Sequence, residues 1–329
     1  MNDIFKNKYL LGVMFAGLLL LPFIAGDYLL RVIIVAGIYV ILTLSLNLVT
    51  GYTGQFCLGW AAFYGIGAYT SALLAINLKL SFWIGLPVAG IMAALFGIAL
   101  GIPTMRLKDI YLAITTLGFG EIIRLLLLNW SDLTRGSMGL PGIPAPSIFG
   151  ISLDNNYFYY YFMLVLVCIV ILAMERIIDS RLGRALSAIR EDELAAKSMG
   201  INTTRYKIIA FAVGAFFAGI AGSFHAHYSS FIDPQSFSFS ESTIILAMVV
   251  LGGMASIKGS VLGALILTLL PEALRDFSEY RMIVFGLIMM AVMLIRPQGI
   301  WGQSKAGTAG IGKIRFKAKG GVVKDAVRG

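Results

Sequence analysis

Three short groups of residues combine types and spacing that could support chemistry, and the first is a glycine-rich stretch near the C-terminus. From Gly307 to Ile314 the chain reads Gly-Thr-Ala-Gly-Ile-Gly-Lys-Ile, which approximates a loop that holds nucleotide phosphates. Such a loop needs Ser or Thr directly after its lysine to bind magnesium, and a strand before it. Ile314 stands at that position, and no strand pattern precedes it. We therefore expect no nucleotide hydrolysis by this chain, no enzymatic activity and no cofactor.

The second group is the pair His225 and His227. On a helix, two residues correspond to about 200° of rotation, so the two rings face nearly opposite directions and do not share a metal ion. We expect both to form hydrogen bonds with neighbours or water. The two cysteines, Cys57 and Cys168, both lie in apolar runs, so the sequence predicts neither a metal site nor a disulfide framework.

The third group is Glu121 and Arg124, which lie three residues apart inside an apolar run. This spacing places them on the same face of a helix. Charges inside a membrane are costly, so they usually pair or face a cavity. Two interpretations remain open, a structural ion pair that neutralises itself and a polar lining or gate of a transport pathway.

The composition indicates that lipid surrounds most of the chain. Hydrophobic residues make up 58% of the 329 residues and charged residues 13%, whereas soluble proteins carry about 25% charged residues. The mean hydropathy is +0.86. A soluble protein has too little polar surface to cover so much apolar area.

Runs without charged residues predict an all-α polytopic membrane protein of about ten transmembrane helices, some of them short or broken. The predicted spans are residues 9–25, two within 32–78, and 81–104, 110–130, 157–174, 208–232, 242–257, 259–274 and 282–295. Residues 1–302 would form the membrane domain. Residues 303–329 would form a basic, disordered cytoplasmic tail.

The net charge of +9 would indicate nucleic-acid binding only if the basic residues were clustered on one surface. With both termini in the cytoplasm, the ten spans place 20 Lys and Arg residues inside and 5 outside. Lys and Arg are enriched in the cytoplasmic loops of membrane proteins. The charge therefore indicates orientation, and we expect no nucleic-acid partner.

Two segments between spans carry the strongest functional signals. The first divides the 32–78 run, and it gives four pathway or gate candidates beside Glu121 and Arg124: Gly51, Thr53, Gly54 and Gln55. The second is the cytoplasmic loop 175–207, where acids precede small residues and a glycine. The loop residues expected to contact a partner are Glu191, Asp192, Glu193, Ala195, Ala196 and Gly200. Acids favour the first turn of a short helix, and Gly200 would end that helix in a left-handed conformation.

The order acid, small residues, glycine in this loop resembles the coupling loop of permeases in ATP-binding-cassette importers. Residues 51–69, 181–185, 251–260 and 296–302 are similar to the motifs of the branched-chain amino-acid permeases. The four motifs occur in the family's order, and the resemblance covers about residues 30 to 302. Of the two permease types in these importers, the long loop 131–156 and the tail are similar to the M-type.

The resemblance implies a permease subunit in the bacterial inner membrane that transports branched-chain amino acids. It also implies four partner subunits besides lipid: a homologous second permease, two cytoplasmic ATPase subunits and an extracytoplasmic solute-binding protein. Permeases for urea and short amides share the motifs, so that substrate class is an alternative. A self-sufficient secondary transporter is an alternative from a different class.

Overall fold

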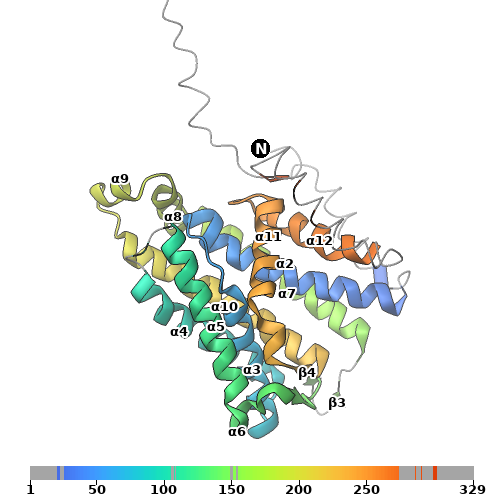
Figure 1. Cartoon of the computed structure of the whole chain (residues 1–329). Coiled ribbons are helices and arrows are strands. Elements are labelled where there is room, and N and C mark those ends of the chain that lie inside the picture. The colour runs from blue at the N-terminus through green and yellow to red at the C-terminus, as the bar shows by residue number, and fades with distance from the viewer. Residues whose placement is uncertain are drawn as a thin grey trace, which may run out of the picture.

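The structure is a computed structural model, and it describes residues 26–104, 107, 109–148, 151–152, 155–273 and 299–301, with residues 21, 22, 286 and 290. Within these residues it is mainly α-helical (Figure 1). The long helices are α2 (Asp27–Thr53), α3 (Trp60–Asn77), α4 (Phe82–Thr104), α5 (Asp109–Asn129), α7 (Asn156–Asp179) and α10 (Thr203–Ser229). The shorter helices are α6 (Ser131–Thr134), α8 (Arg181–Glu191), α9 (Glu193–Ser198), α11 (Phe239–Gly252) and α12 (Ile257–Ala273), with 3-10 turns η1 (Gly136–Met138) and η2 (Pro234–Phe237).

Five of these helices are long and apolar enough to cross a membrane, namely α2, α4, α5, α7 and α10. Each of the eight predicted spans between residues 32 and 274 corresponds to one helix, with α3, α11 and α12 completing the set. The predicted spans 9–25 and 282–295 and the tail 303–329 fall almost wholly outside the described residues. The polytopic all-α class is therefore confirmed, while the number of ten spans and the positions of the termini stay predictions.

The bundle has two different ends (Figure 1). The short helices α8 and α9 lie at one end, and α6 with the short strands lies at the other. At the α6 end, β1 (Leu140–Pro141) pairs antiparallel with β4 (Phe231–Ile232), and β2 (Ser147–Ile148) pairs with β3 (Ile151–Ser152). The β1 and β4 pair joins the loop before α7 to the loop after α10.

Helix α10 packs closely on α3 and α4 because small residues line its contacts. A Cβ atom on Gly219 would lie 2.6 Å from the Cβ of Ala93, and one on Gly222 would lie 2.7 Å from the amide nitrogen of Ala68. Helix–helix interfaces in membranes use small residues in this way. Many glycines of the sequence therefore serve packing.

Two of the helices begin inside the bundle. The Trp60 indole, in the first turn of α3, donates a hydrogen bond to the Ser45 hydroxyl of α2 at 2.8 Å. Ser45 lies about 12 Å along the helix axis from the end of α2. The Ser242 hydroxyl, in the first turn of α11, accepts a hydrogen bond from the Ala61 amide at 2.9 Å. The first turns of α3 and α11 therefore meet within the bundle. This agrees with the prediction that some of the helices are short or broken.

Candidate coupling site

The loop 175–207 forms two capped helices. Ser180 caps α8 by accepting a hydrogen bond from the Leu182 amide at 3.1 Å. Asp192 caps α9 by accepting from the amides of Leu194 and Ala195 at 2.8 and 3.0 Å. The first amides of a helix have no partner within it, so such caps define where a helix begins. The three acids therefore differ in place: Glu191 ends α8, Asp192 is the cap, and Glu193 is the first residue of α9.

Gly200 ends the α9 turn in the left-handed region, with φ of +84°, as the sequence predicts. Its amide donates to the Lys197 carbonyl at 3.0 Å, and the Ile201 amide donates to the Ala196 carbonyl at 3.1 Å. This pair of bonds is the Schellman motif, which favours glycine. A Cβ on Gly200 would meet no atom within 4 Å, so the constraint at this position is conformational.

Glu193 connects α9 to α10. Its carboxylate lies 2.7 Å from the ammonium nitrogen of Lys207, whose side chain is only 6% exposed. The first amides of α9 are held by Asp192 and not by Glu193. A nearly buried ion pair is costly to break because one charge then remains uncompensated. Glu193 therefore fixes α9 to the first part of α10.

Arg190 connects the loop to the end of α2. Its Nη1 donates a hydrogen bond to the carbonyl oxygen of Gly51 at 3.0 Å. Gly54 ends α2 in the left-handed region, with φ of +73°, and a Cβ there would lie 3.1 Å from the Cγ of Arg190. The turn after α2 and the end of α8 are thus in direct contact.

A cavity of about 210 Å³ lies between these two segments. Its lining includes the predicted gate residues Thr53, Gly54 and Gln55 and the predicted loop residues Glu191, Asp192 and Glu193, together with Arg190 and Lys207. The Gln55 side-chain nitrogen is buried without a hydrogen-bond partner among the described residues. The structure therefore brings together two groups of residues that the sequence pointed to separately. Of the two predicted alanines of α9, Ala196 is buried and Ala195 is exposed.

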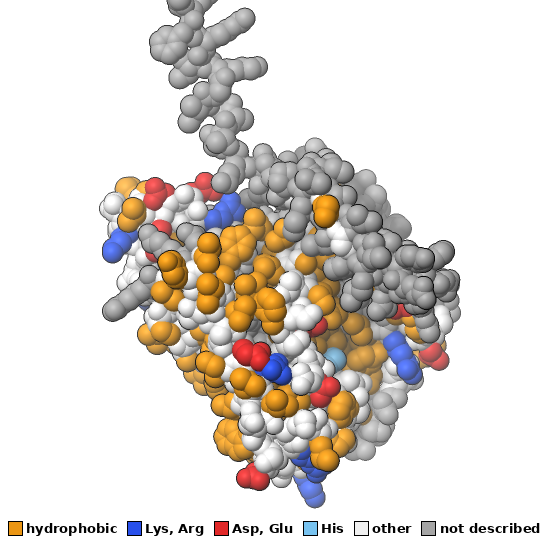
Figure 2. Space-filling view, in the orientation of Figure 1, with side chains coloured by type: hydrophobic (Ala, Val, Ile, Leu, Met, Phe, Trp, Pro, Cys, Tyr) orange, Lys and Arg blue, Asp and Glu red, His pale blue; other side chains and the backbone are white. Residues whose placement is uncertain are grey.

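Glu121 and Arg124 form the expected ion pair, and they lie on α5 away from this cavity. Arg124 Nε lies 3.1 and 3.0 Å from the two Glu121 carboxylate oxygens. Arg124 Nη1 also donates to the side-chain oxygen of Gln235 in η2 at 3.1 Å. The pair thus links α5 to the turn before α11. Figure 2 shows charged side chains as small groups in a mainly hydrophobic face.

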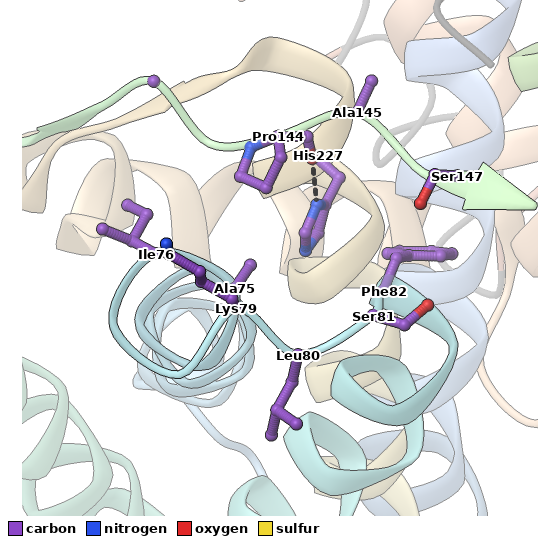
Figure 3. A pocket seen from close by; sticks show the side chains of 11 residues that line it. Ala75, Ile76, Lys79, Leu80, Ser81, Phe82, Pro144, Ala145, Ser147 and His227 are labelled. Atoms are coloured by element: carbon purple, nitrogen blue, oxygen red, sulfur yellow. Dashed lines mark hydrogen bonds between the residues drawn. The ribbon is translucent and has the colours of Figure 1, made fainter. Parts of the chain in front are cut away.

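A larger cavity, of about 510 Å³, opens at the α6 end and is lined by His227 and Pro144 among others (Figure 3). His227 Nδ1 lies 2.7 Å from the Pro144 carbonyl oxygen, and Nε2 lies 2.9 Å from the Ser71 hydroxyl. Because a carbonyl only accepts, Nδ1 carries the proton and Nε2 accepts from Ser71. His225 instead packs on the Tyr64 ring, with centroids 5.5 Å apart. The two histidines have separate neighbours, as predicted, and the described residues contain no metal-binding cluster.

Three polar residues at these contacts were not singled out from the sequence: Arg190, Lys207 and Gln235. Glu241, in the first turn of α11, was not singled out either. Arg190 and Lys207 had been counted only as loop charges for orientation. Glu241 directly precedes a run without charges and was assigned to a loop. Its position one residue before that apolar run could have indicated a carboxylate at the start of a span.

An apolar bundle with five helices long enough to cross a membrane is the architecture of a polytopic membrane protein. Residues 28–293 match the family described as "Branched-chain amino acid transport system / permease component". The match covers well over half of the chain, and the chain belongs to this family.

Named relatives narrow the type within the family. The chain is 41% identical over 318 residues to the high-affinity branched-chain amino acid transport system permease protein LivM of Escherichia coli K12, covering 90% of this chain and 75% of that protein. It is 43% identical over 286 residues to LivM of Salmonella typhimurium, covering 80% and 67%. It is 28% identical to LivH of the same bacterium, covering 80% and 91%. This chain is a LivM-type permease, as the resemblance of the loop 131–156 and the tail predicted. No solved structure matches it.

Proposed function

We propose that this chain is the M-type permease subunit of an ATP-driven importer of branched-chain amino acids in the bacterial inner membrane. It forms the pathway with a homologous second permease. Two cytoplasmic ATPase subunits contact the loop 175–207, and an extracytoplasmic binding protein delivers the solute. The relatives' names support the solute class and the presence of two permease types.

The observation that carries the proposal is the contact between the loop and the end of α2. Arg190 bonds to Gly51, and Glu193 bonds to Lys207. A partner that moves α9 therefore displaces the ends of α2 and α10 together. Movement of packed helices between two arrangements is how transporters expose a pathway alternately to each side.

The outer surface of α9 suits a protein partner. Leu194 is 70% exposed and Met199 is 83% exposed. Large apolar side chains exposed beside charged ones are typical of contact surfaces, because burying them against a partner is favourable. This surface lies at the end of the bundle that carries α8 and α9, opposite the end that carries α6 (Figure 1).

The proposal is tested by reconstituting the chain in liposomes with its second permease, both ATPase subunits and the binding protein. We expect uptake of leucine, isoleucine and valine that requires ATP and every partner. Uptake of urea or short amides in preference to leucine would contradict the proposed substrate class and support the alternative one. Uptake by the chain alone under an ion gradient would contradict it in favour of a secondary transporter.

A further inference from the structure

Glu241 lies in the first turn of α11, which begins inside the bundle. The neighbouring Ser242 hydroxyl bonds to the amide of Ala61 in α3, at 2.9 Å. The Glu241 carboxyl group lies beside the Tyr39 hydroxyl of α2. A carboxyl group is therefore held at the meeting point of α2, α3 and α11.

Glu241 has no basic partner in the part of the chain that the structure describes. The three ion pairs found there join Arg124 to Glu121, Arg190 to Glu191, and Lys207 to Glu193. An uncompensated carboxylate at membrane depth is costly, and residues of this kind mark solute or ion pathways. Glu121 differs, because Arg124 on the same helix neutralises it.

The carboxylate is at the edge of an accessible surface. Glu241 itself is partly exposed, while Phe239, Ser240 and Thr243 on the same helix are exposed. The buried Tyr64 of α3 also lies near Glu241, and its ring contacts His225 at a centroid distance of 5.5 Å. A solute moving along this face would meet a carboxyl group with the Tyr39 phenol beside it.

An amino acid crosses the membrane with an ammonium group and a carboxylate, and each needs a compensating group. Urea and short amides carry neither charge. We propose that Glu241, positioned by Tyr39, binds the ammonium group of a zwitterionic amino acid during passage. This inference rests on the proposed function. It adds the residue that favours amino acids, which carry an ammonium group, over urea and amides, which do not.

The first test compares wild type, Glu241→Gln, Glu241→Asp and Tyr39→Phe in the complete reconstituted complex at equal membrane amounts. We expect Glu241→Gln to reduce leucine uptake by about tenfold or more, since the lost contact is a charged hydrogen bond. Glu241→Asp should retain more uptake than Glu241→Gln, and ATPase activity without substrate should stay near the wild-type rate in both. Uptake by Glu241→Gln within about twofold of wild type would overturn the inference.

A second test leaves Glu241 unchanged. Ser240→Cys is introduced into a Cys57→Ser, Cys168→Ser background, and its rate of maleimide labelling is measured in the complex. We expect leucine to slow labelling, while 4-methylpentanoate, which lacks the ammonium group, leaves the rate unchanged. Equal protection by both compounds, or by neither, would overturn the inference. A wild-type complex that imports no leucine would instead contradict the proposed function, so the two failures are distinguishable.

Discussion

Arg190, near the end of α8, donates a hydrogen bond from Nη1 to the carbonyl oxygen of Gly51, near the end of α2, at 3.0 Å. The two residues are 139 positions apart in the sequence. Their contact joins the loop 175–207 to the turn that separates α2 from α3.

We expect Arg190→Gln to uncouple transport without preventing membrane insertion. A hydrogen bond from a charged donor is worth about 1.5–3 kcal/mol, and its loss frees the end of α2 from α8. Leucine uptake per complex should fall, while the amount of protein in the membrane stays near normal. Arg184→Gln is the matched control, because Arg184 is exposed on the same helix and its side chain bonds to the nearby Asp179 carbonyl at 2.9 Å. Equal losses in both variants would show that the Gly51 contact is not the cause.

Glu193 and Lys207 should behave as a coupled pair in a double-mutant cycle. Replacing Glu193 by Gln leaves the nearly buried Lys207 ammonium without a counter-charge, whereas replacing both by Gln leaves two neutral groups. We expect an interaction energy of about 0.5–3 kcal/mol, measured as thermal stability of the detergent-purified complex. Strictly additive losses would mean that the pair does not hold α9 on α10.

Glu121→Gln and Arg124→Gln should each impair the protein more than the double change does. Either single change leaves one charge within the span, while the double change leaves two side chains able to bond to each other and to Gln235. Membrane yield and leucine uptake of the three variants measure this. A double variant worse than both single variants would indicate separate functions for the two residues.

The loop 175–207 should face the cytoplasm. Ser198→Cys, exposed on α9, is introduced into a Cys57→Ser, Cys168→Ser background and treated with a membrane-impermeant maleimide. We expect labelling in opened cells and none in intact cells, because the distribution of Lys and Arg places this loop inside. A cysteine replacing Ser137 in the loop 131–156, which we expect to face outward, is the control with the opposite expectation. Labelling of Ser198→Cys in intact cells would contradict the orientation.

The helices and the broken segment were predictable because lipid leaves few alternatives. Most crossings need a long uncharged run. The run 32–78 is long enough for two crossings, so a break was expected within it, at residues 51–55. Gly200 was predictable from local chemistry, since few residues adopt positive φ. The partners of Glu193 and Arg190 were not, because they depend on how helices distant in sequence pack. Glu241 was missed for a different reason: dividing the chain at charged residues assigns any charge at a span end to a loop.

The most direct test of the account is ATP-driven leucine uptake by the complete complex carrying Gly200→Val, with Gly200→Asn as the matched control. Valine at a φ of +84° is strained by about 1–2 kcal/mol, whereas asparagine tolerates this conformation. We expect near-normal membrane amounts of both variants, loss of uptake and of substrate-stimulated ATPase activity for Gly200→Val, and near-normal uptake for Gly200→Asn. Full coupled transport by Gly200→Val would contradict the assignment of this loop as the contact through which ATP hydrolysis drives the pathway.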